Sequence, residues 1–319
     1  MSTKIISIGI VSYSGCMQSA VQGLKEMFTL ANDIAKQNNE ENHFSVTLYN
    51  VDTLAQNTPE HSAQIETPQL QVLIIPPSIV GDYYLNPDQT LVHWIKKQHQ
   101  LGAIACSICT GTFILAATGL LQQRKATTHW DLTTQFINTF PQVDLDTNQI
   151  LINDGDIVTA GGLMSWMDLG LEIVAQFSTN NIMRRLGKIM VIDTGQREQR
   201  YYQSFSAKLD HGDKEILVSQ HYMQKNYSKP INITLLSETC LLSERTFLRR
   251  FVKATGYKPI QYLQRVRVQK ACDLIETSNN TIDTISSMVG YEDSSSFRKI
   301  FVKVIGLTPK EFKNRFVNY

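Results

Sequence analysis

The sequence predicts two structural parts: an α/β sandwich built on a mainly parallel sheet, followed by an all-helical part. Strand-like and helix-like segments alternate through the first 180 residues, which is the pattern of a parallel sheet covered by helices. A polar segment interrupts the chain near residue 195, and the pattern beyond it is helical to the end. Within this helical part the sequence matches itself at an offset of 50 residues.

The elements of the α/β part follow from the spacing of apolar residues. Runs rich in β-branched residues predict strands over 5–11, 44–51, 71–75 and 103–107, and a hairpin that joins 150–152 to 157–159 through Asn153-Asp154-Gly155. Apolar residues at helical spacing predict helices over 21–37, 91–100, 111–119, 163–177 and 182–192.

Length and composition limit the class of protein. A length of 319 residues favours two domains, and 42% hydrophobic with 18% charged residues is typical of globular proteins. The longest apolar runs are too short to cross a bilayer, and residues 5–11 are interpreted as a first strand rather than a signal peptide. Five cysteines, at positions 16, 106, 109, 240 and 272, lack metal-type spacing. We therefore expect a cytoplasmic protein with no membrane partner, metal or cofactor.

The net charge of +1 hides an asymmetry along the chain. Residues 1–209 carry 13 Lys/Arg against 18 Asp/Glu, a net charge of −5, whereas residues 210–319 carry 17 against 11, a net charge of +6. A basic C-terminal part is typical of binding to nucleic acid through one end of the molecule. An ordinary solvated surface would give the same asymmetry, so charge alone leaves both interpretations open.

The internal repeat predicts two helix-turn-helix units. Phe247 and Phe251, one helical turn apart, match Phe297 and Phe301, and the match continues through two Gly, two Pro and two Arg at the same offset. In the first unit a short helix over 234–239 precedes a second helix capped by Ser243. In the second unit Gly290 makes the turn, Asp293 is the cap, and Ile300 joins the two phenylalanines in the core.

Burial of the phenylalanines leaves polar side chains on the outer face of each second helix. Short hydroxyl side chains suit base edges, and Arg or Lys suits guanine or phosphate. Solvated helical hairpins would show the same residues, so this alternative stays open. The predicted DNA-binding residues are Ser243, Arg245, Thr246, Arg249, Arg250, Ser294, Ser295, Ser296, Arg298 and Lys299.

The motif Gly290-Tyr291-x-Asp293-(x)3-Phe297-(x)3-Phe301-(x)4-Gly306-x-Thr308-Pro309-(x)2-Phe312 resembles the AraC/XylS signature. The resemblance covers about residues 215–316. It implies two helix-turn-helix units bridged by a long helix, here 260–276, each placing its second helix in successive major grooves. It also implies a sequence-specific transcription regulator with double-stranded DNA and the transcription machinery as partners. Ser237 and Ser286 stand where alanine is usual.

Cys109 lies where a strand turns into a helix, between Ala103 and Phe113. Helix N-terminal N–H groups there are expected to lower the pKa of the thiol and favour the thiolate, and Gly111 allows close packing of the helix. Cys106, within the strand, is expected to be an inert core residue.

The continuation from Leu115 to Trp130 resembles the PfpI/ThiJ (amidotransferase-like) domains fused to AraC-type regulators, the GlxA-type group. This resemblance covers about residues 4–193 and implies a flavodoxin-like parallel-sheet sandwich. His129 follows Cys109 at the spacing seen in that superfamily. The superfamily's acidic partner falls near Ser19, yet no Asp or Glu occurs between residues 5 and 25. The turn that supplies an oxyanion N–H is Pro77-Ser78, and Pro77 has no N–H.

These departures favour a non-catalytic pocket that binds a ligand or senses oxidation. Its candidate residues are Ser19, Ser78, Cys109, His129 and Asp168. His129 could equally bond a backbone group. Asp168 could instead serve merely to cap its helix or to pair within it. A structural or dimerising domain is one alternative, and a cysteine-dependent PfpI-like hydrolase or glyoxalase-type enzyme with a DNA-binding tail is another.

The predicted organisation is a sensor or dimerisation domain over 1–195, a linker over 196–212 and a double helix-turn-helix domain over 213–319. A homodimer is expected because paired half-sites multiply affinity, and a small-molecule effector is a possible partner.

Overall fold

The computed structural model describes residues 4–51, 69–195 and 197–317. The chain divides into two compact units, with the boundary between Gln199 and Arg200. Residues 200–212, which the sequence predicts as linker, fall within the second of these units. Within the described ranges no helix is long and apolar enough to span a membrane.

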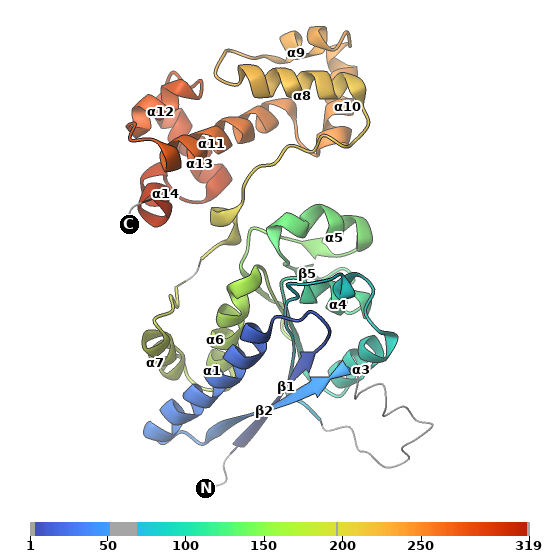
Figure 1. Ribbon diagram of the computed structural model, residues 1–319, viewed down its shortest axis with the longest axis vertical. Helices are drawn as coiled ribbons and strands as arrows, with labels where there is room; N and C mark the ends of the chain where they lie inside the picture. Colours follow the sequence, from blue (N-terminus) through green and yellow to red (C-terminus); the bar gives the residue numbers. More distant parts are fainter. Residues whose placement is uncertain (1–3, 52–68, 196, 318–319) are drawn as a thin grey trace. The chain divides into compact units, whose positions relative to one another are not determined.

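The first unit is built on a mainly parallel sheet, as predicted (Figure 1). In the described part of the chain, six strands form this sheet in the order β2-β1-β3-β4-β8-β7, and only the β7–β8 pair is antiparallel. The strands are β1 (Lys4–Ser12), β2 (Asn42–Asn50), β3 (Val72–Ile75), β4 (Ile104–Ile108), β7 (Leu151–Asn153) and β8 (Ile157–Ala160). A separate parallel pair joins β5 (Lys125–Ala126) to β6 (Asp144–Leu145).

Helices cover both faces of the sheet (Figure 1). On one face α1 packs against α6 and α7, and on the other α3 packs against α4 and β3. The helices are α1 (Gln18–Gln37), α3 (Gln89–Gln100), α4 (Gly111–Ala117), α5 (Thr133–Thr139), α6 (Trp166–Phe177) and α7 (Asn180–Met190). Because both faces are covered, β3 and β8 are buried at every residue. This explains why β3 appears in the sequence as a continuous apolar run and why β8 contains only Thr159 as a polar residue.

The structure moves several predicted helix ends. The helix predicted over 91–100 begins at Gln89, because the Asp88 carboxylate accepts a hydrogen bond from the Thr90 backbone N–H at 2.6 Å. The segment predicted as one helix over 163–177 begins instead with a short 3-10 helix, Leu163–Ser165. Other 3-10 helices are Tyr83–Leu85, Trp130–Leu132 and Gln199–Tyr202.

The second unit is all-helical (Figure 1). It contains two cores that share one helix. Phe247, Phe251 and Tyr262 are buried in the first core, and Phe297, Phe301 and Phe312 in the second. Ile300 was expected in the core but is only half-buried. The helices are α8 (Lys214–Asn226), α9 (Ile233–Thr239), α10 (Glu244–Thr255), α11 (Pro259–Thr277), α12 (Ile282–Met288), α13 (Ser294–Ile305) and α14 (Pro309–Phe316).

Both predicted caps of the second helices are confirmed. The Ser243 hydroxyl accepts from the Thr246 backbone N–H, and the Asp293 carboxylate accepts from the backbone N–H groups of Ser295 and Ser296 at 3.0 and 2.8 Å. α10 and α13 each end at a glycine in the left-handed region, Gly256 (φ 78°) and Gly306 (φ 88°), where a side chain would add strain.

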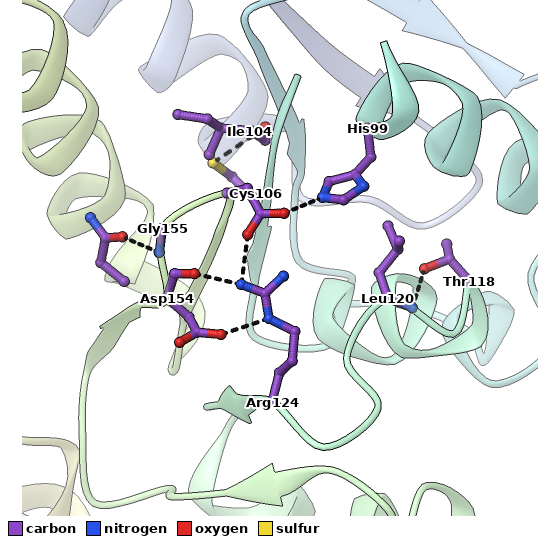
Figure 2. A network of polar contacts seen from close by, with 10 residues as sticks. His99, Ile104, Cys106, Thr118, Leu120, Arg124, Asp154 and Gly155 are labelled. Carbon is purple, nitrogen blue, oxygen red and sulfur yellow. Dashed lines mark hydrogen bonds and ion pairs between the residues drawn. The ribbon is translucent and has the colours of Figure 1, made fainter. Parts of the chain in front are cut away.

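A network of charged side chains ties the amino-terminal end of the sheet together (Figure 2). Arg124 donates from Nε to Asp154 and from Nη2 to Asp156, each at 2.6 Å. The His99 ring lies 2.7 Å from Asp156 on the other side. His99 lies in the last turn of α3, Arg124 precedes β5, and the two carboxylates come from the β7–β8 turn. The network therefore joins three segments that are far apart in sequence.

Replacing Asp156 with Asn should lower stability in a pH-dependent way. The hydrogen bond from Arg124 is the main cause that lowers the pKa of Asp156 from 3.8 to about 2. A carboxylate whose pKa is lower in the folded state stabilises the protein above its unfolded pKa, and this contribution is lost as the pH falls through the folded value. In urea titrations, we expect the free energy of unfolding to be lower for Asp156→Asn at pH 7, with the difference from wild type shrinking between pH 5 and pH 2.5.

The matched control is Asp33→Asn on the exposed face of α1, which should change little at any pH. A difference for Asp156→Asn that stays constant with pH would contradict the role given to its charge.

Candidate functional site

Cys109 lies at the sharp turn between β4 and α4, as predicted. Its φ of 54° is in the left-handed region, which is uncommon for a residue with a side chain. Its backbone N–H donates to the Ala160 carbonyl at 2.7 Å. A Cβ at Gly111 would lie 2.6 Å from the Ile75 carbonyl oxygen and 2.8 Å from that of Pro76, so glycine is required for α4 to begin this close to the end of β3.

The expectation that helix N–H groups hold Cys109 as a thiolate is wrong. Only 2% of the residue is exposed, and burial raises the pKa of its thiol to about 12. Hydrogen bonds from the backbone N–H groups of Thr110 and Gly162 lower the pKa, but less than burial raises it. The lost hydration of a charged sulfur therefore outweighs the attraction of the helix N-terminus, and the thiol is protonated at neutral pH.

Ser78 is the predicted pocket residue that the structure brings to the cysteine turn. Its backbone N–H donates to the Thr110 hydroxyl at 2.6 Å, and its own hydroxyl donates to the carbonyls of Gly15 and Val80. The N–H that could have served an oxyanion is therefore already bound within the protein.

Tyr13 belongs to the same cluster and was not singled out from the sequence. Its hydroxyl donates to the Pro76 carbonyl at 2.7 Å. Burial, with smaller contributions from Cys16 and Cys109, raises the pKa of Tyr13 above its usual range, and a hydrogen bond with Thr110 opposes this. Its position just after β1 could have revealed it, because the carboxyl ends of parallel strands meet at one edge of the sheet.

The other predicted pocket residues have different surroundings. Ser19 is exposed in the first turn of α1. His129 Nδ1 accepts from the Asp131 backbone N–H at 3.2 Å, which is the local bond foreseen as its alternative role, and burial lowers the pKa of the ring. Asp168 binds Arg197 through both carboxylate oxygens, at 3.0 and 2.6 Å, so its partner lies outside its own helix.

A chain of hydrogen bonds connects the cysteine turn to the last residue of the first unit. The Thr128 hydroxyl donates to the Cys109 carbonyl at 2.7 Å. The Gln199 side-chain amide donates to the Thr128 carbonyl at 2.9 Å and accepts from the Trp130 backbone N–H at 2.8 Å. Gln199 is only 3% exposed, although its segment is polar and was predicted to be linker.

Slow alkylation should reveal the buried, protonated thiol. Because only the thiolate reacts and 2% of the residue is exposed, we expect iodoacetamide to alkylate Cys109 in the native protein at least about a hundredfold more slowly at pH 7 than in urea-unfolded protein, where the thiol has an ordinary pKa. Mass mapping of the modified peptides measures both rates, and equal rates in native and unfolded protein would refute the burial argument.

The predicted DNA-binding residues lie on α10 and α13 and at their caps, and they fall into two groups. Exposed basic side chains are Arg245, Arg249, Arg298 and Lys299. Several others already have partners within the protein: the Ser243 hydroxyl donates to that of Thr246 at 3.0 Å, and the Ser296 hydroxyl donates to Asp293 at 2.7 Å. Arg298 also lies 2.8 Å from Asp283, but this pair is exposed and exposed pairs are weak.

Arg250, unlike the exposed basic side chains of the predicted set, is bound to two carboxylates of its own chain. Its guanidinium donates to both carboxylate oxygens of Asp213, at 2.9 and 2.6 Å, and also reaches Glu215. The hydrogen bonds with Arg250 are the main cause that lowers the pKa of Asp213. This pairing fixes α10 to the beginning of α8, and a contact of Arg250 with DNA would require breaking it.

The α8–α9 loop also fixes the second helix-turn-helix unit. Arg267 of α11 donates to the carbonyls of Tyr227 and Lys229 at 2.7 and 2.9 Å. Gly290, with φ 89°, lies against this loop, and a Cβ there would come within 2.6 Å of the Ser228 carbonyl oxygen. The glycine of the second turn is thus required by its φ and by close packing.

Comparison with known proteins finds two family matches and several regulators among the relatives. A helix-turn-helix domain model matches residues 236–315, and the DJ-1/PfpI family model matches residues 32–176. The regulator CdhR of Pseudomonas aeruginosa is 24% identical over 223 residues, which is 69% of this chain and 66% of that protein. The regulator GlxA of Rhizobium meliloti is 24% identical over 223 residues, covering 69% and 68%.

An enzyme is also similar to part of the chain. Isonitrile hydratase of Pseudomonas putida is 29% identical over 112 residues, which is 35% of this chain and 47% of that enzyme. The two family matches fall one in each compact unit, and the regulators align with 69% of the chain. The chain therefore carries a DJ-1/PfpI-family domain followed by a helix-turn-helix domain of AraC type.

Proposed function

We propose that this protein is a transcription regulator that binds double-stranded DNA of specific sequence through its C-terminal unit. The observation that carries the proposal is the pair of capped helices α10 and α13, each the second helix of a helix-turn-helix unit with exposed basic side chains. CdhR and GlxA, which are described as HTH-type transcriptional regulators, support it. Because the alignments span about two thirds of those proteins, their partners are not transferred to this chain.

Recognition would divide between base reading and phosphate binding. Arg245, Arg249, Arg298 and Lys299 are exposed on the two helices and would reach guanine or phosphate. Ser295 would offer a hydroxyl to a base edge. Arg250 is assigned a structural role, because Asp213 and Glu215 hold its guanidinium. Ser243, whose hydroxyl caps α10, would contribute to recognition by stabilising that helix.

For the N-terminal unit we propose sensing rather than catalysis. A thiol with its pKa raised to about 12 is a poor nucleophile at neutral pH. The Ser78 N–H is bound to Thr110 at 2.6 Å and Pro77 has none, so the turn lacks an open oxyanion donor. A small ligand held among Tyr13, Ser78 and Cys109 would instead change the packing of the turn. The predicted pocket roles of Ser19, His129 and Asp168 stay predictions.

The bonds of Thr128 and Gln199 supply a route from this turn to the rest of the chain. A shift of the Cys109 carbonyl would act on Thr128 and through it on Gln199, after which the DNA-binding unit begins. We further propose that the protein works as a homodimer with the transcription machinery in the cytoplasm. All five cysteines are free, which suits a reducing compartment.

Single substitutions on the two recognition helices test the DNA-binding proposal. Arg249→Ala and Arg298→Ala should each weaken binding to the duplex that the wild-type protein selects from a random pool, by about 1–3 kcal/mol for a base contact. For a phosphate contact the slope of affinity against salt should fall by about one. Fluorescence anisotropy at several salt concentrations measures both quantities.

Lys188→Ala on the exposed side of α7 is the matched control, since it removes a positive charge from the other unit. If both arginine variants keep the wild-type affinity and salt slope, the assignment of the recognition helices is wrong.

The second candidate function is a cysteine-dependent enzyme with a DNA-binding tail, which the similarity to isonitrile hydratase favours. We expect purified protein to show no turnover of isonitriles, amides or dicarbonyls that depends on Cys109, measured against Cys109→Ser. Cys240→Ser, which changes a buried cysteine of the other unit, controls for loss of a thiol. Turnover at ordinary enzyme rates that disappears only in Cys109→Ser would overturn the sensing proposal.

A further inference from the structure

Residues 200–205, here called the strap, contact both helix-turn-helix units. They precede the segment 236–315 that the helix-turn-helix family model matches, yet they belong to the second compact unit. Three of the six are aromatic: Tyr201, Tyr202 and Phe205. An aromatic residue in a simple polar linker has no surface to pack against, whereas each of these does.

The first half of the strap lies on the second helix-turn-helix unit. The Tyr202 ring meets the Phe316 ring edge-on at 5.5 Å, and its hydroxyl accepts from Arg315 at 3.3 Å. The Arg315 guanidinium also lies 5.4 Å from the centre of the Tyr201 ring, within the range of a cation–π contact. Gly306 ends α13 beneath the strap, and a Cβ there would collide with Arg200 and Tyr201.

The last residue of the strap inserts into the first helix-turn-helix unit. The Phe205 ring packs edge-on against Tyr262 at 5.2 Å and Tyr257 at 6.1 Å. Tyr262 is 1% exposed and contacts Phe251 of α10 at 5.3 Å, so Phe205 extends the core that supports that helix. The Phe205 backbone N–H donates to Gln269 of α11 at 2.7 Å.

The strap is short enough to limit the separation of the two helix-turn-helix units. Three residue steps separate Tyr202 from Phe205, and an extended chain spans at most about 10 Å over that length. Besides the strap, two features connect the two cores. One is α11, which contributes residues to both, and the other is the contact of the α8–α9 loop with Arg267 and Gly290. A helix with a core at each end can still bend, and the strap opposes that bending because it is bound at both ends.

We propose that the strap positions the two helix-turn-helix units of one chain at one fixed spacing, so that both recognition helices meet the DNA together. A half-site is here the stretch of base pairs that one helix-turn-helix unit reads, so each chain reads two of them. The inference rests on the proposed DNA-binding function. Two sites held rigidly bind with a high effective concentration for the second contact, and a loosened connection lowers it without removing any contact with DNA. Gln199, the residue before the strap, is bonded to Thr128, so the strap is also the first part of the DNA-binding unit that a change at the cysteine turn would reach.

The test uses full-length protein and three kinds of duplex. The first is selected by the wild-type protein from a random pool, the second has one of its two half-sites randomised, and the third has one to three base pairs inserted between the half-sites. Phe205→Ala and the double variant Tyr201→Ala/Tyr202→Ala each loosen one end of the strap. Tyr202→Phe keeps the ring packed on Phe316 and is the matched control.

We expect both loosened variants to bind the intact duplex at least about tenfold more weakly than wild type and the single half-site within about twofold. They should also lose less affinity on base-pair insertion than the wild type does, a change that a purely structural role would not produce. Tyr202→Phe should behave as wild type. Thermal unfolding followed by circular dichroism identifies a variant that fails to fold, and the variant at the other end of the strap then carries the test.

Two results would overturn the inference while DNA binding stands: unchanged binding of the intact duplex by both variants, or equal weakening on the intact duplex and the single half-site. A wild-type protein that selects no duplex would overturn the proposed DNA-binding function itself, and the strap inference with it.

Discussion

The close approach of α4 to the end of β3 constrains the whole N-terminal unit. It requires a residue without a side chain at position 111, because the carbonyl oxygens of Ile75 and Pro76 occupy the place of a Cβ. The approach forces the chain through a left-handed turn at Cys109 and buries the thiol beneath the loops that follow β1, β3 and β8. Tyr13, Ser78 and Gly162 are brought to the cysteine from these loops.

Burial then decides what the cysteine can do. Two opposing effects act on its pKa: N–H groups at the turn stabilise the thiolate, and the loss of water destabilises it. The second effect is larger, so the turn holds a neutral thiol. The same packing binds the Ser78 N–H to Thr110. A domain with these properties is better suited to report a change in its packing than to stabilise a charged intermediate.

Competition for partners shapes the all-helical unit in a similar way. Basic side chains on a recognition helix are equally good partners for carboxylates of their own chain. Asp213 and Glu215 take Arg250 out of the exposed set, whereas Arg245 and Arg249 on the same helix stay at the surface. The unit as a whole is held by aromatic contacts and by two glycines, Gly290 and Gly306, each with a neighbouring segment in the place of its side chain.

Local patterns in the sequence were enough to predict most of the architecture. The order of strands and helices follows from residue spacing, and the caps at Ser243 and Asp293 and the turns at Cys109 and Gly290 follow from neighbours within a few positions. The buried pairs Phe247/Phe251 and Phe297/Phe301 follow from their spacing by one helical turn. The family resemblances added the flavodoxin-like form of the sandwich and the bridging helix.

Tertiary structure alone decided which polar side chains meet. Gln199 bonds Thr128 across 71 positions, and Asp168 bonds Arg197 across 29. Neither pair has a sequence signal, because a polar residue in a polar segment looks the same whether it is buried or solvated. The raised pKa of Cys109 and the packing of the strap depend on burial in the same way. Spacing along the chain determines local geometry. Burial depends on every segment that folds over a residue, and these segments come together only in the tertiary structure.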